Sequence, residues 1–139
     1  MVAAWFASNC HSKSHRESFV KEIKKHIEMD VYGKCGTLKC GKPTTGDTTG
    51  GKECFQPLEN KYFFYLALEN SLCRDYITEK FFRTMTYNII PVTYNGVNMT
   101  DFAPPHSYID ATQFKSIEEL ATYLLKVCIL SIHCVAYTL

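Results

Sequence analysis

The sequence predicts an α/β fold in which a parallel β-sheet is covered by helices on both of its faces. Short apolar segments alternate along the chain with segments whose apolar residues recur at every fourth position. Two capping-box sequences, Ser14 to Glu17 and Ser116 to Glu119, mark expected helix starts. The chain of 139 residues is 46% hydrophobic with a formal net charge of +1, which suits a single domain and excludes disorder.

The N-terminal part is expected to form a strand, a helix and a second strand. Residues 2–7 are continuously apolar and lead into a polar, turn-like segment, which is typical of a strand that ends in a loop. A helix is predicted over about 14–27, because apolar residues recur there at Phe19, Ile23 and Ile27. Residues 30–32 form the second short strand, which Gly33 stops.

A long loop is expected over residues 33–53, which contain six of the seven glycines and almost no apolar side chains. Cysteines at 35, 40 and 54 bracket this loop, and a disulfide there would restrain it; the sequence leaves the pairing open. Seven cysteines in a chain of this size indicate an oxidising compartment. Structural zinc is disfavoured, because no Cys-x2-Cys and no histidine pair at ligand spacing occurs.

The C-terminal part is expected to add three strands and two helices. Residues 62–68 are uninterrupted and aromatic, as in a central strand covered on both faces. A helix over about 75–86 follows, and then a strand over 88–94 in which Pro91 suggests an edge or a bulge. After a short strand at 108–109, the second capping box opens a helix that carries Leu120, Tyr123, Leu124 and Val127.

Composition and motifs exclude several classes of function. Basic and acidic residues are interspersed and nearly equal in number, which argues against a general nucleic-acid-binding surface. Neither Gly-x-Gly-x-x-Gly nor Gly-x4-Gly-Lys-Ser/Thr occurs, so the common dinucleotide and ATPase motifs are absent. Parallel sheets bind ligands at the carboxyl ends of their strands, and two strand-to-helix crossings qualify, at residues 8–16 and 69–80.

The second crossing carries a cluster of side chains suited to ligand binding. Tyr76, Glu79 and Lys80 lie three and four positions apart, so on a helix they would share one face of its first turn. The ammonium suits a diphosphate, and the carboxylate suits a sugar hydroxyl or a cationic sugar centre. Arg16, at the other crossing, would supply a second cation to the same phosphates. The competing interpretation is a solvated Glu-Lys pair, with Tyr76 in the core.

Long segments of the chain resemble the donor-binding signature of the α1,3-fucosyltransferases, glycosyltransferase family 10. The similarity is carried by residues 64–71, 75–82, 90–92 and 101–105, together with 5–10, Arg16 and 30–36. It covers about residues 2–127 and is greatest to invertebrate members, which have a cysteine-rich loop after the second strand. Leu68 departs from the family's Phe in the Phe-Glu-Asn segment, which should change packing only.

The resemblance implies a GT-B glycosyltransferase of two Rossmann-like domains, with residues 1–127 as its C-terminal, GDP-fucose-binding domain. Arg16 and Lys80 would then hold the diphosphate, and Glu79 would stabilise the oxocarbenium-like transition state of the fucose. The nucleotide-sugar pocket would be lined by Ser8, Asn9, Tyr65, Asn70 and Tyr76. No metal or other cofactor is obligatory in this family, and the sequence has no Asp-x-Asp motif.

The implied activity is inverting transfer of L-fucose from GDP-fucose to N-acetylglucosamine of protein-linked glycans, core or antennal. Because the family's catalytic base lies in an N-terminal acceptor domain absent from these residues, we expect a donor-binding half that needs that domain for turnover. The alternative is a nucleotide-sugar-binding module or pseudoenzyme without transferase activity. Residues 128–139 do not match the family pattern and are expected to form a divergent apolar tail.

The resemblance also implies a location. We expect the full-length parent to be a single-pass type II membrane protein of the Golgi lumen, with no anchor in this chain. Its expected partners are GDP-fucose, an N-glycan acceptor and the missing acceptor domain, with no nucleic acid. A glycosylation sequon at residues 98–100 agrees with a lumenal location.

Overall fold

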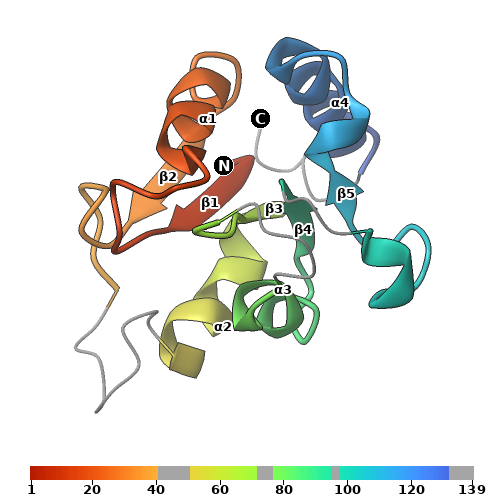
Figure 1. Ribbon diagram of the computed structural model, residues 1–139. Helices are drawn as coiled ribbons and strands as arrows, with labels where there is room; N and C mark the ends of the chain where they lie inside the picture. Colours follow the sequence, from red (N-terminus) through yellow and green to blue (C-terminus); the bar gives the residue numbers. More distant parts are fainter. Residues whose placement is uncertain (41–50, 72–76, 95–97, 132–139) are drawn as a thin grey trace.

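The computed structural model describes residues 1–40, 51–71, 77–94 and 98–131 (Figure 1). Strands and helices alternate along these segments, as the sequence predicts. In chain order they are β1 (Ala3–Phe6), α1 (Arg16–Ile23), β2 (Met29–Tyr32), α2 (Gly51–Lys61), β3 (Phe64–Ala67), α3 (Glu79–Thr84), β4 (Ile90–Thr93), η1 (Met99–Asp101), β5 (Ile109–Asp110), η2 (Ala111–Gln113) and α4 (Ile117–Leu130).

The five strands form one sheet in the order β2-β1-β3-β4-β5, and every neighbouring pair is parallel. This confirms the predicted α/β class. The chain passes from β1 to β2 through α1 and from β2 to β3 through α2. In the sheet, β2 lies on one side of β1 and β3 on the other, so the direction in which strands are added reverses at β1. The crevice outside the carboxyl ends of β1 and β3 is therefore a topological switch point, where open parallel sheets bind their ligands.

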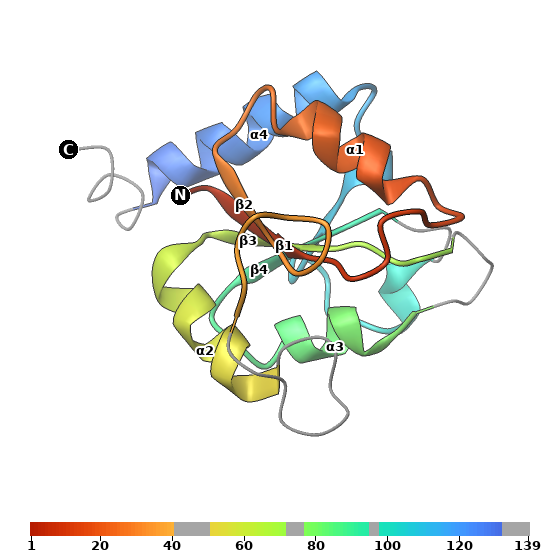
Figure 2. The same cartoon turned by 90° about the vertical axis from the view of Figure 1, so that its left-hand side faces the viewer.

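Helices cover both faces of the sheet, as predicted: α1 and α4 lie on one face, and α2 and α3 on the other (Figures 1 and 2). Each layer has its own apolar cluster against the strands. Phe19 and Ile23 of α1 pack with Leu120 and Leu124 of α4 in the first cluster. The second cluster contains Phe55, Leu58 and Phe81.

The central strand β3 shows why its sequence is apolar without interruption. It pairs with β1 on one side and β4 on the other, and all four of its residues are buried. Phe64 and Leu66 belong to the α1–α4 cluster, whereas Tyr65 and Ala67 belong to the α2–α3 cluster. Successive side chains of a strand point to opposite faces, and here both faces are covered by helices.

The first helix begins at Arg16, so the capping box predicted at Ser14 is wrong. His15 at the N-cap position has φ 54° and makes no side-chain cap. The Ser14 hydroxyl instead donates to the Glu69 carbonyl oxygen at 2.6 Å, and Glu17 Oε1 accepts from the Ser12 amide at 2.9 Å. Ser14 thus attaches the start of α1 to the loop after β3, and Glu17 attaches it to the loop before the helix.

Helix α2 (Gly51–Lys61) is not predicted from the sequence. The sequence predicts a long loop over residues 33–53 and no further element before the strand at 62–68. Pro57 and the glycines before Lys52 hide the helix, because both residue types normally end helical patterns. Its described apolar side chains nevertheless pack on the sheet, as the ring of Phe55 lies 5.0 Å from that of Tyr65. Tertiary packing therefore overrides the local preference here.

Two disulfides hold the loops that follow the first two strands. Cys10 and Cys35 join the loop after β1 to the loop after β2, and Cys40 pairs with Cys54 of α2. The predicted disulfides around the long loop are therefore confirmed, with a pairing that the sequence left open. In the described parts of the chain no group of three or more histidine, cysteine or carboxylate side chains could hold a metal ion.

Strand β4 is not at the edge of the sheet, so the edge position suggested by Pro91 is wrong. It lies between β3 and β5, and Pro91 is paired with Tyr65. The Ile90 amide donates to Phe63 of the β3 side, and alternate residues of a strand direct their amides to opposite neighbours. The nitrogen of Pro91, which carries no hydrogen, therefore faces β5. Pairing between β4 and β5 begins only at Val92, so no hydrogen bond is lost there.

Helix α4 begins as predicted, because the Ser116 hydroxyl accepts a hydrogen bond from the Glu119 amide at 3.0 Å. It continues to Leu130, across the domain boundary that we predict at residue 127; that boundary stays a prediction. Within the described residues, no helix is both long enough and apolar enough to cross a membrane.

Replacing Ser116 with alanine should lower the free energy of unfolding by about 1 kcal/mol, because an amide of the first turn loses its cap. Chemical denaturation measures this change. Lys126→Ala, an exposed position on the same helix, is the matched control and should change the free energy by less than about 0.5 kcal/mol. Equal values for the two variants would contradict a capping role for Ser116.

Candidate functional site

A cavity of about 330 Å³ lies at the carboxyl ends of β1, β2 and β3, at the switch point of the sheet. Its walls come from the loops after these strands and from the starts of α1 and α3. The lining residues are Phe6, Ala7, Ser8, Asn9, Arg16, Gly33, Cys40, Asn70, Glu79 and Lys80. Six of the eight site residues proposed from the sequence are among them, so both strand-to-helix crossings meet at one place.

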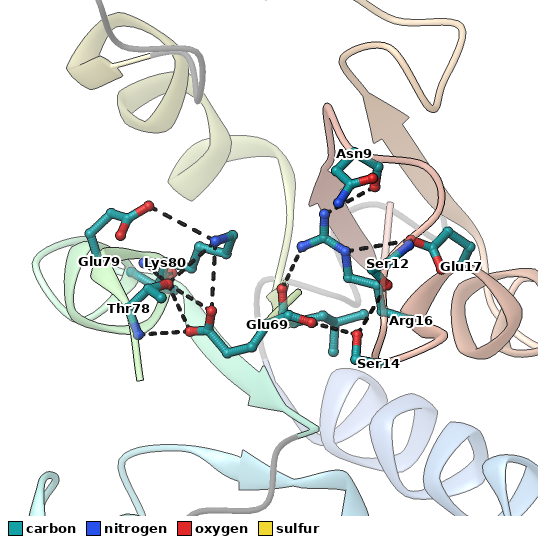
Figure 3. Close-up of polar contacts among 11 residues, drawn as sticks. Asn9, Ser12, Ser14, Arg16, Glu17, Glu69, Thr78, Glu79 and Lys80 are labelled. Atoms are coloured by element: carbon teal, nitrogen blue, oxygen red, sulfur yellow. Dashed lines mark hydrogen bonds and ion pairs between the residues drawn. The ribbon is translucent and has the colours of Figure 1, made fainter. Parts of the chain in front are cut away.

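Arg16 provides a fixed positive charge at the α1 side of the cavity (Figure 3). Its side chain is 2% exposed. The guanidinium donates to the Leu68 carbonyl at 2.8 Å and to the Asn9 carbonyl at 3.1 Å, and it lies 5.3 Å from the centre of the Trp5 ring. Arg16 therefore ties the loop after β1 to the loop after β3, so its position is set by the fold and not by a ligand.

The α3 side carries the second cation, Lys80. The helix begins at Glu79 and not at residue 75, with Thr78 as its N-cap. Lys80 Nζ lies 3.3 Å from Thr78 Oγ1, 3.6 Å from Glu69 Oε2 and 3.9 Å from Glu79 Oε1. The Lys80 side chain is only 15% exposed, so it is not part of a solvated face; the Glu79 side chain, 56% exposed, extends into solvent.

Glu69 is a functional candidate that the sequence analysis missed. It lies between the two cations in Figure 3, and its side chain is completely buried. Its carboxylate accepts hydrogen bonds from the Thr78 amide at 2.9 Å and from the Thr78 hydroxyl at 2.8 Å. The available signal was an acidic residue directly after a fully apolar strand, because a buried carboxylate requires partners.

Asn70, Ser8 and Asn9 line the cavity with polar groups. The side-chain oxygen of Asn70 is buried and accepts no hydrogen bond from any residue that the structure describes. Ser8 and Asn9 are exposed, and the Asn9 side chain accepts from the His11 amide at 3.2 Å. The cavity therefore offers hydrogen-bonding groups as well as charges.

Neither of the two tyrosines proposed from the sequence is among the described residues that line the cavity. Tyr65 is 2% exposed in the core of the α2–α3 face, with its ring 6.1 Å from that of Phe6. This burial raises the pKa of its hydroxyl well above the ordinary value, so the phenol stays neutral. Tyr76 lies outside the described residues.

Glu17 adds a carboxylate next to Arg16, at 3.8 Å from its Nε. Burial alone would raise the pKa of this carboxyl, but hydrogen bonds from its own amide and from Ser12, and the nearby Arg16 charge, lower it below the usual value. The carboxylate is therefore charged at neutral pH, and it holds the loop before α1 in place.

A second cavity, of about 500 Å³, lies between α1 and β2. Its lining includes Lys21, Lys24 and Lys34 but none of the eight residues proposed from the sequence. All three lysines are exposed, so this cavity lacks a buried, pre-positioned cation. Of the two, the cavity at the switch point is the one that combines fixed positive charge with an adjacent carboxylate, an arrangement suited to a diphosphate attached to a sugar.

Comparison with known families gives one match that covers nearly the whole chain. The family model described as "Glycosyltransferase family 10 (fucosyltransferase) C-term" matches residues 1–130. Alpha-(1,3)-fucosyltransferase C of Drosophila melanogaster is 46% identical over 123 residues, which are 88% of this chain and 27% of that protein. GDP-fucose protein O-fucosyltransferase 3 of Homo sapiens is 37% identical over 123 residues, 84% of this chain and 25% of that protein.

Solved structures show the same fold. A crystal structure of an alpha1,3-fucosyltransferase with GDP-fucose superimposes with a TM-score of 0.69 at 21% identity, covering 96% of this chain and 36% of that one. A second crystal structure of an alpha1,3-fucosyltransferase, with GDP, gives a TM-score of 0.71. The chain spans about a quarter of the length of the curated relatives described above.

Proposed function

Because the chain belongs to glycosyltransferase family 10, the fucosyltransferases, we propose that it binds GDP-fucose as the donor-binding part of an α1,3-fucosyltransferase. The observation that carries this proposal is the presence of Arg16 and Lys80, from two separate strand-to-helix crossings, in the wall of one cavity. The names of both relatives refer to fucosyl transfer, and the human one names GDP-fucose. The donor is therefore the substrate that this domain is expected to recognise.

In this proposal the diphosphate binds between the two cations. Arg16 and Lys80 are both mostly buried, so their attraction for phosphate is screened less than that of surface lysines. Ser8, Asn9 and Asn70 would hydrogen-bond the remainder of the nucleotide sugar, with the accepting oxygen of Asn70 available for a ribose or sugar hydroxyl. Tyr76 would complete the pocket. Tyr65 would support it from the core, through the ring of Phe6, which lines the cavity.

Glu79 is proposed to act on the sugar. Its exposed carboxylate lies next to Lys80, so a diphosphate held by Lys80 would bring the attached fucose close to Glu79. Positive charge develops on the sugar ring as the bond to the diphosphate breaks, and an adjacent carboxylate stabilises that charge. The diphosphate leaves with the electron pair, and the acceptor hydroxyl attacks the opposite face and inverts the anomeric carbon.

The complete reaction also needs a base that takes the proton of the acceptor hydroxyl. We propose that this base lies in an N-terminal acceptor domain of a two-domain GT-B parent located in the Golgi lumen. The acceptor is proposed to be N-acetylglucosamine of a protein-linked glycan. Two disulfides in the described residues support an oxidising compartment.

Calorimetric titration with GDP and with GDP-fucose tests donor binding. We expect saturable heat with both ligands, and the absence of heat at millimolar GDP would refute the proposed site. A transfer assay with GDP-fucose and a chitobiose-bearing glycopeptide then distinguishes the enzyme from the alternative, a binding module without activity. We expect turnover only when the acceptor domain is supplied.

Glu79→Gln in the full-length parent should lower turnover more than it lowers donor affinity, because its charge matters most when the sugar becomes cationic. The measurement is kcat together with the dissociation constant of GDP-fucose. Equal losses in both quantities would contradict a role in the transition state and would indicate ordinary ground-state binding.

A further inference from the structure

We propose that Glu69 is a positioning residue that fixes Lys80 relative to Arg16 and so sets the spacing of the two cations that hold the diphosphate. The inference rests on the proposed function. It goes beyond it by assigning a role to a completely buried carboxylate that does not line the cavity. Glu69 favours donor binding only through Thr78 and Lys80.

The backbone around Glu69 is held by the α1 side of the cavity. Three consecutive carbonyl oxygens accept hydrogen bonds from two residues of that side. The Leu68 carbonyl accepts from Arg16 at 2.8 Å, the Glu69 carbonyl from the Ser14 hydroxyl at 2.6 Å, and the Asn70 carbonyl from the Ser14 amide at 3.1 Å. The position of this loop is therefore tied to the position of the Arg16 guanidinium.

The side chain of Glu69 holds the α3 side of the cavity. Both carboxylate oxygens lie 2.8 Å from the Thr78 hydroxyl, and one of them also accepts from the Thr78 amide. Lys80 Nζ lies 3.6 Å from the carboxylate and donates to the Thr78 hydroxyl at 3.3 Å. The backbone at Glu69 is thus fixed to the α1 side, where Arg16 bonds the preceding carbonyl and Ser14 the Glu69 carbonyl, and the Glu69 side chain is fixed to Thr78 and Lys80 (Figure 3).

Burial decides which carboxylate fixes Lys80. The Glu79 side chain is 56% exposed, and exposed ion pairs contribute little because water screens them. The Glu69 side chain is completely buried, so its interactions are screened much less and its position is set by packing. Lys80 therefore stays where Glu69 and Thr78 hold it, before any ligand arrives. Pre-positioning of this kind lowers the entropic cost of binding.

Two substitutions separate position from charge. Glu69→Asp keeps the charge but shortens the side chain by one methylene, and the backbone cannot follow because Ser14 and Arg16 hold it. We expect GDP affinity to fall about tenfold to thirtyfold, the factor that corresponds to ordering a free lysine side chain on binding. Glu69→Gln keeps the length and an acceptor for Thr78, and it also removes a negative charge near the diphosphate, so its loss should be smaller.

A double-mutant cycle shows whether Glu69 acts through Lys80. In a Lys80→Ala background, Glu69→Asp should weaken GDP binding by no more than about twofold further, because the group that it positions is gone. If Glu69→Asp weakens GDP binding in this background as much as in the unsubstituted chain, the effect of Glu69 is general destabilisation and the inference is wrong. The matched control is Glu22→Asp, the same change in an exposed ion pair of α1 with Lys25, which should leave GDP affinity unchanged.

Amide hydrogen exchange provides a readout that needs no ligand. The Thr78 amide donates to Glu69, so Glu69→Asp should accelerate its exchange, whereas Glu22→Asp should not. Unchanged exchange at Thr78, or a loss of GDP affinity in Glu69→Gln as large as in Glu69→Asp, would overturn the positioning role. Failure of the unsubstituted chain to bind GDP would instead refute the proposed function, and the inference with it.

Discussion

Replacing Lys80 with alanine is expected to weaken GDP binding by about 1.5 to 3 kcal/mol, the range for hydrogen bonds to charged groups. Lys80 is the cation on the α3 side of the described cavity wall, and its ammonium is held in place by Thr78 and Glu69 before a ligand binds. Alanine removes the charge and leaves the carboxylate of Glu69 near the diphosphate. Titration calorimetry of the two proteins measures the difference directly.

Lys25→Ala is the control for the loss of one positive charge. Lys25 is exposed at the end of α1 and forms an ion pair with Glu22 at 2.6 Å, away from the cavity lining. Its replacement should change GDP affinity by less than about twofold, because exposed charges are screened. If both variants lost the same affinity, general electrostatic attraction would explain binding, and Lys80 would have no specific role.

Replacing Arg16 with alanine should lower the free energy of unfolding by about 3 to 5 kcal/mol, more than the other substitutions considered. The buried guanidinium satisfies the carbonyls of Leu68 and Asn9 and packs over Trp5. Alanine would leave both carbonyls without this donor and open a cavity beside the indole. Chemical denaturation measures the change, and Lys24→Ala, an exposed position at the end of α1, is the matched control.

This structural role affects how the binding role of Arg16 is tested. Alanine would weaken GDP binding, by about 1.5 to 3 kcal/mol if only the charged hydrogen bonds were lost, but partial unfolding would add to that loss. Arg16→Lys keeps the charge without the planar fork that reaches two carbonyls, so it should reduce stability less than alanine. An alanine variant that lost less than about 1 kcal/mol of stability would contradict the connecting role of Arg16.

The sequence predicted β1 and β3 well because both are short apolar runs in a sheet with both faces covered. The run at residues 62–68 became β3, and the run at 2–7 became β1. Helix starts were harder to predict. Ser116 caps α4, but the identical signal at Ser14 is used for a contact with Glu69, which is distant in sequence. A local pattern does not reveal whether a serine bonds its own helix or another segment.

The site was predictable where chemistry and topology agree. The carboxyl ends of parallel strands must meet at one edge, and this brought Arg16 and Lys80 into the same cavity. Tyr65 is a core residue because it lies within a strand covered on both faces. Glu69 was missed because its partners, Thr78 and Lys80, are nine and more positions away, and the sequence gives no sign of which residues reach a buried carboxylate.

The most direct test of the account is an NMR titration of the isotope-labelled chain with GDP. We expect the largest shifts at the Arg16 guanidinium, the Asn70 side-chain amide and the amides of Ser8 and Asn9, all in the wall of the switch-point cavity. Spectra unchanged at millimolar GDP would contradict donor binding by this domain. Shifts confined to the cavity between α1 and β2 that Lys21 lines would contradict binding at the switch point.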